Sequence, residues 1–293
     1  MHLFTRMRRV PRAAIVTTAL VMAFTLAGVA VGAGIGIHPV KITTPTAENQ
    51  MTNLDVLRLE IKNYYGDPNG TGNFAPASNY AKEAQKIANM GWNWLSKPAN
   101  LANPNRAIVL DVDDTTLATW NYEVFSNWAY NPTTNATYVN GQLFPAVPGM
   151  VDLLWAAKGA GYAIFFITGR PDSQHAATMG NLGPDDAIPS PDIDAGYPTI
   201  TALDIGHGGY TDGLFTKPPV GSYPSYLNQP AFCASAISLS ASCATVKYKS
   251  GTRAYIESFG WDVVADFGDQ YSDGLGGYMD KFFKMPNPNY YLP

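Results

Sequence analysis

The sequence predicts an α/β protein: a three-layer, Rossmann-like parallel sheet with a helical N-terminal extension and a small lid-like insertion. Continuous apolar runs at residues 107–110, 163–167 and 263–265 are typical of strands that are buried on both faces. A helical segment opened by Pro148-Gly149 separates the first two runs. The order strand, helix, strand favours parallel neighbours in one sheet.

Two helices are expected before the first strand. Apolar residues recur at helical spacing over residues 54–61 and again over residues 80–95. The first helix should stop near Gly66, and Ser78 is a suitable N-cap for the second. These two segments form the predicted helical extension.

The remaining stretches are assigned by composition. The aromatic-rich residues 120–138 are interpreted either as core that packs the insertion on the sheet or as a stacking platform beside the site. Residues 184–246 are rich in Pro, Gly and Ser, so loops and a small lid-like insertion are expected there. Residues 250–258 predict a short helix that ends at Gly260.

The N-terminus predicts export. Residues 1–12 are basic, and residues 13–37 contain no charged side chain, a pattern typical of a secretion signal. An uncleaved membrane anchor is the alternative, because about 20 apolar residues span a bilayer. The predicted organisation is a signal peptide or anchor at 1–37, a linker at 38–50 and one domain at 51–293. We expect a secreted or extracytoplasmic body that meets a membrane only through this segment.

Charge and composition exclude several classes of protein. The chain has 19 basic and 23 acidic residues, and four of the basic ones are arginines among the first twelve positions. The rest is acidic, which argues against binding to nucleic acid. Apolar residues make up 46% and charged residues 14%, so a folded body is expected rather than a disordered chain.

Cys233 and Cys243 are the two cysteines of the chain. In an exported protein they favour a disulfide, with two unpaired thiols as the alternative. The spacing gives no indication of zinc, which takes four ligands.

Reactive residue types follow each of the three predicted strands. Asp111 and Asp113 follow the first, Thr168 the second, and Asp269 and Asp273 the third. The carboxyl ends of parallel strands share one edge of the sheet, so these side chains should converge. Four carboxylates would repel one another unless a cation lay among them, and oxygen ligands of this kind suit Mg²⁺. A nearby lysine would complete the charge balance.

These residues resemble the four-motif signature of the haloacid dehalogenase superfamily. The motifs are Asp-x-Asp-x-Thr from Asp111, Thr168-Gly169-Arg170, a lysine, and Gly-Asp-x-x-x-Asp through Asp269 and Asp273. The finer match is to class C / subfamily IIIB acid phosphatases, which include bacterial surface enzymes and plant vegetative storage relatives. Tyr248-Lys249-Ser250-x-x-Arg253 and Thr178-x-x-Asn181-Leu182 are similar to further motifs of that group. The long stretch between Arg170 and Lys249 departs from its pattern.

The resemblance implies specific catalytic roles. Asp111 would be the nucleophile that forms an aspartyl-phosphate, and Asp113 would protonate the leaving alkoxide and then activate water. Positions i and i+2 of an extended strand end point the same way, so both acids can reach one substrate. Lys249 would neutralise charge on the nucleophile and the phosphoryl group. It is preferred to Lys247 because a serine and an expected helix start follow it.

The same resemblance implies the binding residues. Thr168, Gly169 and Arg170 would contact the phosphoryl oxygens, although Arg170 is equally compatible with a structural ion pair. The expected Mg²⁺ ligands are Asp111, the backbone carbonyl of Asp113, Asp269 and Asp273.

The predicted function is an exported, Mg²⁺-dependent acid phosphatase that hydrolyses phosphate monoesters. Nucleotide, sugar and aryl phosphates all remain candidate substrates. A non-catalytic storage or binding protein of the same fold is one alternative, although such relatives tend to lack the nucleophile. A phosphotransferase is another. The four histidines show neither ligand spacing nor a Ser-His-Asp pattern.

Overall fold

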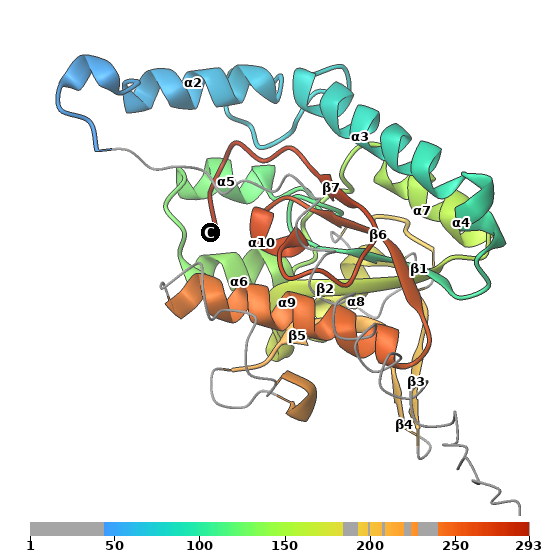
Figure 1. Ribbon diagram of the computed structural model, residues 1–293. Coiled ribbons are helices and arrows are strands. Elements are labelled where there is room, and N and C mark those ends of the chain that lie inside the picture. The colour runs from blue at the N-terminus through green and yellow to red at the C-terminus, as the bar shows by residue number, and fades with distance from the viewer. Residues whose placement is uncertain are drawn as a thin grey trace, which may run out of the picture. The chain divides into compact units, whose positions relative to one another are not determined.

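A computed structural model describes residues 44–183, 193–198, 200–206, 209–219, 224–227 and 240–292. A five-stranded sheet in the order β5-β2-β1-β6-β7 forms the centre of the domain (Figure 1). Every neighbouring pair in it is parallel, and the predicted parallel α/β fold is confirmed. The strands are β1 (Arg106–Leu110), β2 (Ala163–Pro171), β5 (Leu214–Lys217), β6 (Asp262–Gly268) and β7 (Phe282–Lys284).

Helices cover both faces of this sheet. The helices α3 (Asn79–Leu95) and α7 (Met150–Gly159) pack on one another on one side, and α9 (Ser240–Ser258) crosses β2 and β6 on the other (Figure 1). A Cβ atom at Gly91 would lie 2.6 Å from the ring of Phe267, so glycine lets α3 approach β6 closely. The central strands β1 and β2 are almost wholly buried, which explains their continuous apolar sequence.

The predicted helical extension is confirmed. After the turn η2 (Glu48–Gln50), α2 (Leu54–Tyr64) begins at Asn53, whose side chain accepts from the N–H groups of Asp55 and Val56. The predicted cap Ser78 accepts from the N–H of Ala81, which starts α3. A short α4 (Pro98–Ala102) leads into β1.

The aromatic stretch after β1 belongs largely to the core. It forms α5 (Trp120–Ser126) and α6 (Pro132–Asn140). Trp120 is fully buried and stacks on Tyr65 with ring centroids 4.1 Å apart. The core interpretation is confirmed for Trp120 and Tyr122, whereas Tyr130 is 72% exposed.

Two expectations for the later chain were incomplete. The stretch 184–246 is not only loops, because it supplies β5 to the main sheet and a hairpin of β3 (Leu203–Gly206) and β4 (Gly209–Thr211). The expected helix at 250–258 begins ten residues earlier, at Ser240. The first five residues of α9 are Ser, Ala and Cys, which give no helical periodicity. The strand β5 is too short to give a clear strand pattern. The smaller elements are η3 (Asp172–Gln174), α8 (His175–Leu182), η4 (Ser225–Leu227) and α10 (Tyr271–Gly274).

Three predictions fall outside the described residues. They are the signal peptide or anchor at 1–37, residues 38–43 of the linker predicted at 38–50, and the pairing of Cys233 with Cys243, whose side chains are not described. Among the helices that are described, none has the length and apolar character needed to cross a bilayer.

Candidate active site

The carboxyl edge of the sheet gathers the predicted acids. Asp111 follows β1, and its backbone N–H donates to the carbonyl of Phe267 at the end of β6. Asp269 follows β6, and Asp273 lies in α10. One carboxylate oxygen from each of these three acids lies within 4.8 Å of the other two, and all three side chains are buried. Residues that are far apart in the sequence therefore share one small volume.

Lys249 provides the positive charge at this cluster. Its Nζ lies 2.5 Å from Oδ1 of Asp111 and 2.6 Å from Oδ1 of Asp273. Burial works to lower the pKa of Lys249, but the two carboxylates outweigh it and hold the pKa above its ordinary value. The preference for Lys249 over Lys247 thus agrees with the structure. The helix start used to support it was wrong, because α9 begins at Ser240.

The hydrogen bonds of Asp269 and Asp273 orient their oxygens. Oδ2 of Asp269 accepts from both Gln270 Nε2 and Asn287 Nδ2, each at 2.6 Å. Oδ2 of Asp273 accepts from the backbone N–H of Gln270 at 2.8 Å. Burial, with the nearby carboxylates of Asp273 and Asp114, raises the pKa of Asp269 to about 7. Charge on Asp269 is therefore costly unless a further cation binds.

The predicted phosphoryl-binding residues lie at the carboxyl end of β2. Thr168 is fully buried and its hydroxyl accepts from the N–H of Arg170, while Gly169 is exposed. Arg170 does not extend freely into the site. Its guanidinium contacts Asp113, with Nη2 at 2.6 Å from Oδ1, and Nη1 donates to the hydroxyl of Thr178 at 3.0 Å. Of the two interpretations of Arg170, this structure contains the ion pair.

Three residues of the site had no site role assigned from the sequence. Asp114 has φ +51° and a fully buried carboxylate that accepts from the N–H and hydroxyl of Thr119. Burial raises its pKa to about 6, although the bonds from Thr119 oppose this. Asn287, which reaches Asp269, lies in an Asn/Pro-rich tail that gave no signal. The third is Arg253.

Arg253 fixes α10, which carries Asp273, and the residues that follow it. It is 1% exposed and pairs with Asp266 at 2.8 Å. It also donates to the backbone carbonyls of Asp273, Leu275 and Gly277. The Lys-Ser-x-x-Arg spacing drew attention to this residue but not to its role.

These residues fit a divalent metal ion. Three buried carboxylates meet one ammonium group, which leaves an excess of negative charge among largely buried side chains. Carboxylate oxygens are ligands that Mg²⁺ accepts. Asp111, Asp269 and Asp273 are the residues that would hold the ion.

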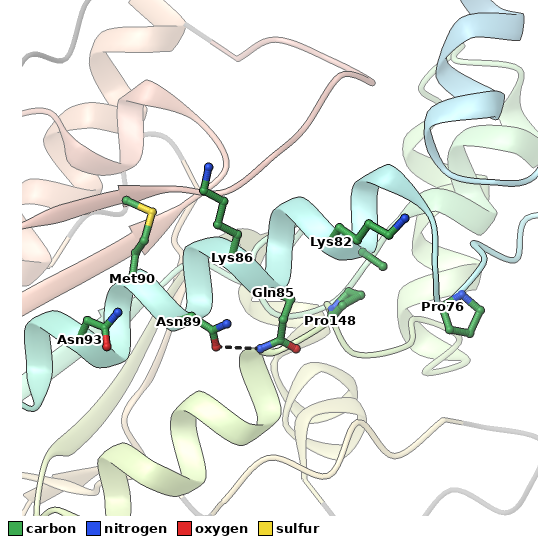
Figure 2. A pocket seen from close by; sticks show the side chains of 9 residues that line it. Pro76, Lys82, Gln85, Lys86, Asn89, Met90, Asn93 and Pro148 are labelled. Atoms are coloured by element: carbon green, nitrogen blue, oxygen red, sulfur yellow. Dashed lines mark hydrogen bonds between the residues drawn. The ribbon is translucent and has the colours of Figure 1, made fainter.

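A large groove elsewhere in the domain lacks this chemistry. It lies along α3, has a volume of about 510 Å³ and is lined by Lys82, Lys86, Met90 and the hydrogen-bonded pair of Gln85 and Asn89 (Figure 2). None of the clustered acids lines it, so the acid cluster is the candidate active site.

The fold and site together define a class of protein: a Rossmann-like α/β protein with clustered acids and a lysine at the carboxyl edge of a parallel sheet. The chain belongs to the HAD superfamily, subfamily IIIB (Acid phosphatase), whose family model matches residues 43–187 and 237–293. The predicted resemblance is confirmed.

Named relatives include both an enzyme and glycoproteins. The chain is 27% identical to the stem 28 kDa glycoprotein of Glycine max over 195 residues, or 65% of this chain and 61% of that protein. It is 25% identical to acid phosphatase 1 of Solanum lycopersicum over 223 residues, or 73% of this chain and 69% of that one. The match to the stem 28 kDa glycoprotein spans less than two thirds of that protein's length. A vegetative storage protein of Arabidopsis thaliana is 40% identical over 48 residues, or 16% of this chain and 18% of that protein.

Solved structures share the fold. The class C acid phosphatase from Bacillus anthracis has a TM-score of 0.52 at 21% identity, covering 73% of this chain and 80% of that one. The same enzyme with tungstate bound has a TM-score of 0.55 at 19% identity, covering 82% and 87%.

Proposed function

We propose that this protein is an exported, Mg²⁺-dependent acid phosphatase that hydrolyses phosphate monoesters through an aspartyl-phosphate on Asp111. One observation carries the proposal. Asp111 is 7% exposed, its carboxylate lies 2.5 Å from Nζ of Lys249, and it is clustered with Asp269 and Asp273. A nucleophile held beside a cation and a metal-binding pair is the arrangement that phosphoryl transfer needs.

The proposed first step forms the covalent intermediate. An oxygen of Asp111 attacks phosphorus while the bond from phosphorus to the ester oxygen breaks, and the electrons of that bond stay with the leaving oxygen. Asp113 gives its proton to that oxygen, so the product leaves as a neutral alcohol. Lys249 stabilises negative charge on the carboxylate and on the transferring group. A bound Mg²⁺ would supply Lewis-acid stabilisation of the phosphoryl oxygens.

The second step regenerates the enzyme. Asp113, now a carboxylate, takes a proton from water as the water oxygen attacks phosphorus, and the bond between phosphorus and Asp111 breaks. Inorganic phosphate leaves, and both acids return to their starting states. Thr168 and the backbone at Gly169 are proposed to bind the phosphoryl oxygens. Arg170 is proposed to act at Asp113, which it already contacts.

Storage without catalysis is the second candidate. It is favoured by the similarity to a stem glycoprotein and a vegetative storage protein of plants. Against it stands the complete acid–lysine constellation at the sheet edge. Small phosphate monoesters are the proposed substrates. Export and the disulfide of Cys233 and Cys243 remain proposals from the sequence.

The deciding experiment compares Asp111→Asn with wild type. The purified proteins are assayed on phenyl phosphate with Mg²⁺, after EDTA treatment, and after Mg²⁺ is restored. We expect wild type to lose activity in EDTA and regain it, and Asp111→Asn to lose about 10³-fold or more, since it cannot form the acyl phosphate.

Asp152→Asn is the matched control, because it makes the same change at an exposed residue of α7. It should keep full activity. Full activity in Asp111→Asn would remove the assigned nucleophile, and a folded wild type that hydrolyses nothing with Mg²⁺ would favour the storage role.

A further inference from the structure

A lysine outside the matched family segments lies at the same edge of the sheet. Lys217 ends β5, where it is level with Pro171 of β2, just beyond Thr168-Gly169-Arg170. The family model leaves residues 188–236 unmatched, and β5 belongs to that stretch. Lys217 of this unmatched stretch therefore lies at the carboxyl edge of the sheet, where the candidate site is.

Contacts of Lys217 direct its amine toward the catalytic lysine. Its Nζ donates to the hydroxyl of Thr245 at 3.0 Å. Thr245 and Lys249 are four positions apart on α9, so they lie on one face of the helix, roughly 5–6 Å apart. Lys217 is thus held one helical turn from the base of the lysine that contacts Asp111.

The charges of the two lysines are balanced differently. Lys249 contacts two carboxylates, whereas Lys217 has no carboxylate within ion-pair distance among the described residues. The nearby Asp172 instead accepts from the hydroxyl of Thr216 at 2.7 Å. Burial and the neighbouring Lys249 both lower the pKa of Lys217. A half-buried cation beside another cation is unfavourable until an anion binds.

We propose that Lys217 binds a second anionic group of the substrate, so that the enzyme prefers phosphate monoesters that carry a further carboxylate or phosphate. This inference rests on the proposed phosphatase function. The ester phosphate lies against Asp111 and Lys249, and Lys217 is offset by about one turn of α9. It therefore reaches a group beyond the ester phosphate rather than the ester phosphate itself.

An edge-strand lysine can also serve only to discourage pairing with another sheet. Such a lysine extends outward into solvent. Lys217 instead turns its amine onto Thr245 of α9, and its side chain is partly buried. The contact favours a role inside the site.

The test measures selectivity. Phenyl phosphate is compared with its 2-, 3- and 4-carboxy derivatives and with 1,3-phenylene bisphosphate, using wild type, Lys217→Gln and Lys217→Arg. The carboxylates and the bisphosphate distinguish the two sources of anionic oxygen. For the best bis-anionic substrate we expect Lys217→Gln to lower kcat/KM about tenfold or more, chiefly through KM, with phenyl phosphate changed less than twofold. Lys217→Arg should retain most of the preference.

Lys247→Gln is the control, since it removes the same charge from the partly exposed face of α9. It should leave unchanged the ratio of kcat/KM for the bis-anionic substrate to kcat/KM for phenyl phosphate. An unchanged ratio in Lys217→Gln, or equal losses on all substrates, would overturn the inference while the phosphatase function stood. Failure of wild type to hydrolyse any of these esters would overturn the phosphatase function and this inference with it.

Discussion

Arg170 holds the carboxylate of Asp113 in a forked ion pair. Nη2 lies 2.6 Å from Oδ1, and Nε lies 3.1 Å from Oδ2. The side chain of Arg170 is 3% exposed and that of Asp113 is 30% exposed. The guanidinium lies 5.3 Å from the ring centroid of Phe144. A rigid, buried arginine therefore fixes the orientation of an acid at the rim of the site.

We expect Arg170→Ala to slow hydrolysis by an amount that depends on the leaving group of the ester. Asp113 matters most when the leaving oxygen needs a proton, so hydrolysis of ethyl phosphate should fall about 10²-fold or more and that of 4-nitrophenyl phosphate far less. In Asp113→Asn, adding Arg170→Ala should cost little more, because the two residues act as one unit. Steady-state kinetics on the single and double variants measures this.

Arg170→Lys is the companion variant, because lysine keeps the charge but cannot make the fork. It should show the same leaving-group pattern in milder form. Equal losses for both esters, additive with Asp113→Asn, would instead place Arg170 on the phosphoryl group.

The contact between Asn287 and Asp269 predicts an effect on metal affinity. Asn287 Nδ2 donates to Oδ2 of Asp269 and orients its carboxylate. Groups that orient ligands typically affect metal affinity 10- to 100-fold. We expect Asn287→Ala to raise the Kd for Mg²⁺ by about tenfold or more, as measured by calorimetry on the folded protein.

Asn289→Ala is the control from the same tail. Asn289 contacts Tyr65 and Trp128 and none of the clustered acids. An equal change in Kd for the two variants would mean that the tail acts by general packing and not through Asp269.

Glu123 predicts a dependence of stability on pH. Its side chain is buried in α5, and burial, then the carboxylates of Asp114 and Asp113, raise its pKa to about 8. The folded state therefore binds the proton of Glu123 more tightly than the unfolded chain does. The stabilisation of the folded state by this tighter proton binding is full below about pH 4.5 and is lost as the pH rises toward 8.

Glu123→Gln should remove this dependence, because the amide stays neutral. Relative to wild type, we expect its free energy of unfolding to increase by about 1 to 4 kcal/mol between pH 5 and pH 8.5. Urea unfolding at both values measures it. Glu60→Gln makes the same change at an exposed residue, and its free energy of unfolding should depend on pH as that of wild type does. If the free energy of unfolding changed with pH equally in Glu123→Gln and in wild type, the buried, protonated state of Glu123 would be contradicted.

Much of the fold could be predicted because local patterns encode it. β1 and β2 are continuous apolar runs, and Ser78 caps α3 as the sequence indicates. β5 and β7 were missed, since strands of four and three residues carry almost no periodicity. They enter the sheet because their neighbours β2 and β6 present open edges, which is a property of the assembled fold.

The sequence by itself determined which reactive side chains gather at one edge of the sheet: each predicted strand ends in such side chains, and the edge of a parallel sheet brings strand ends together. Only the tertiary structure decided their partners. Arg170 forms an ion pair with Asp113. Asn287 in the C-terminal tail donates to Asp269, and Lys217 donates to Thr245 of α9. Such contacts depend on how helices and loops pack over the sheet, and spacing along the chain does not encode that packing.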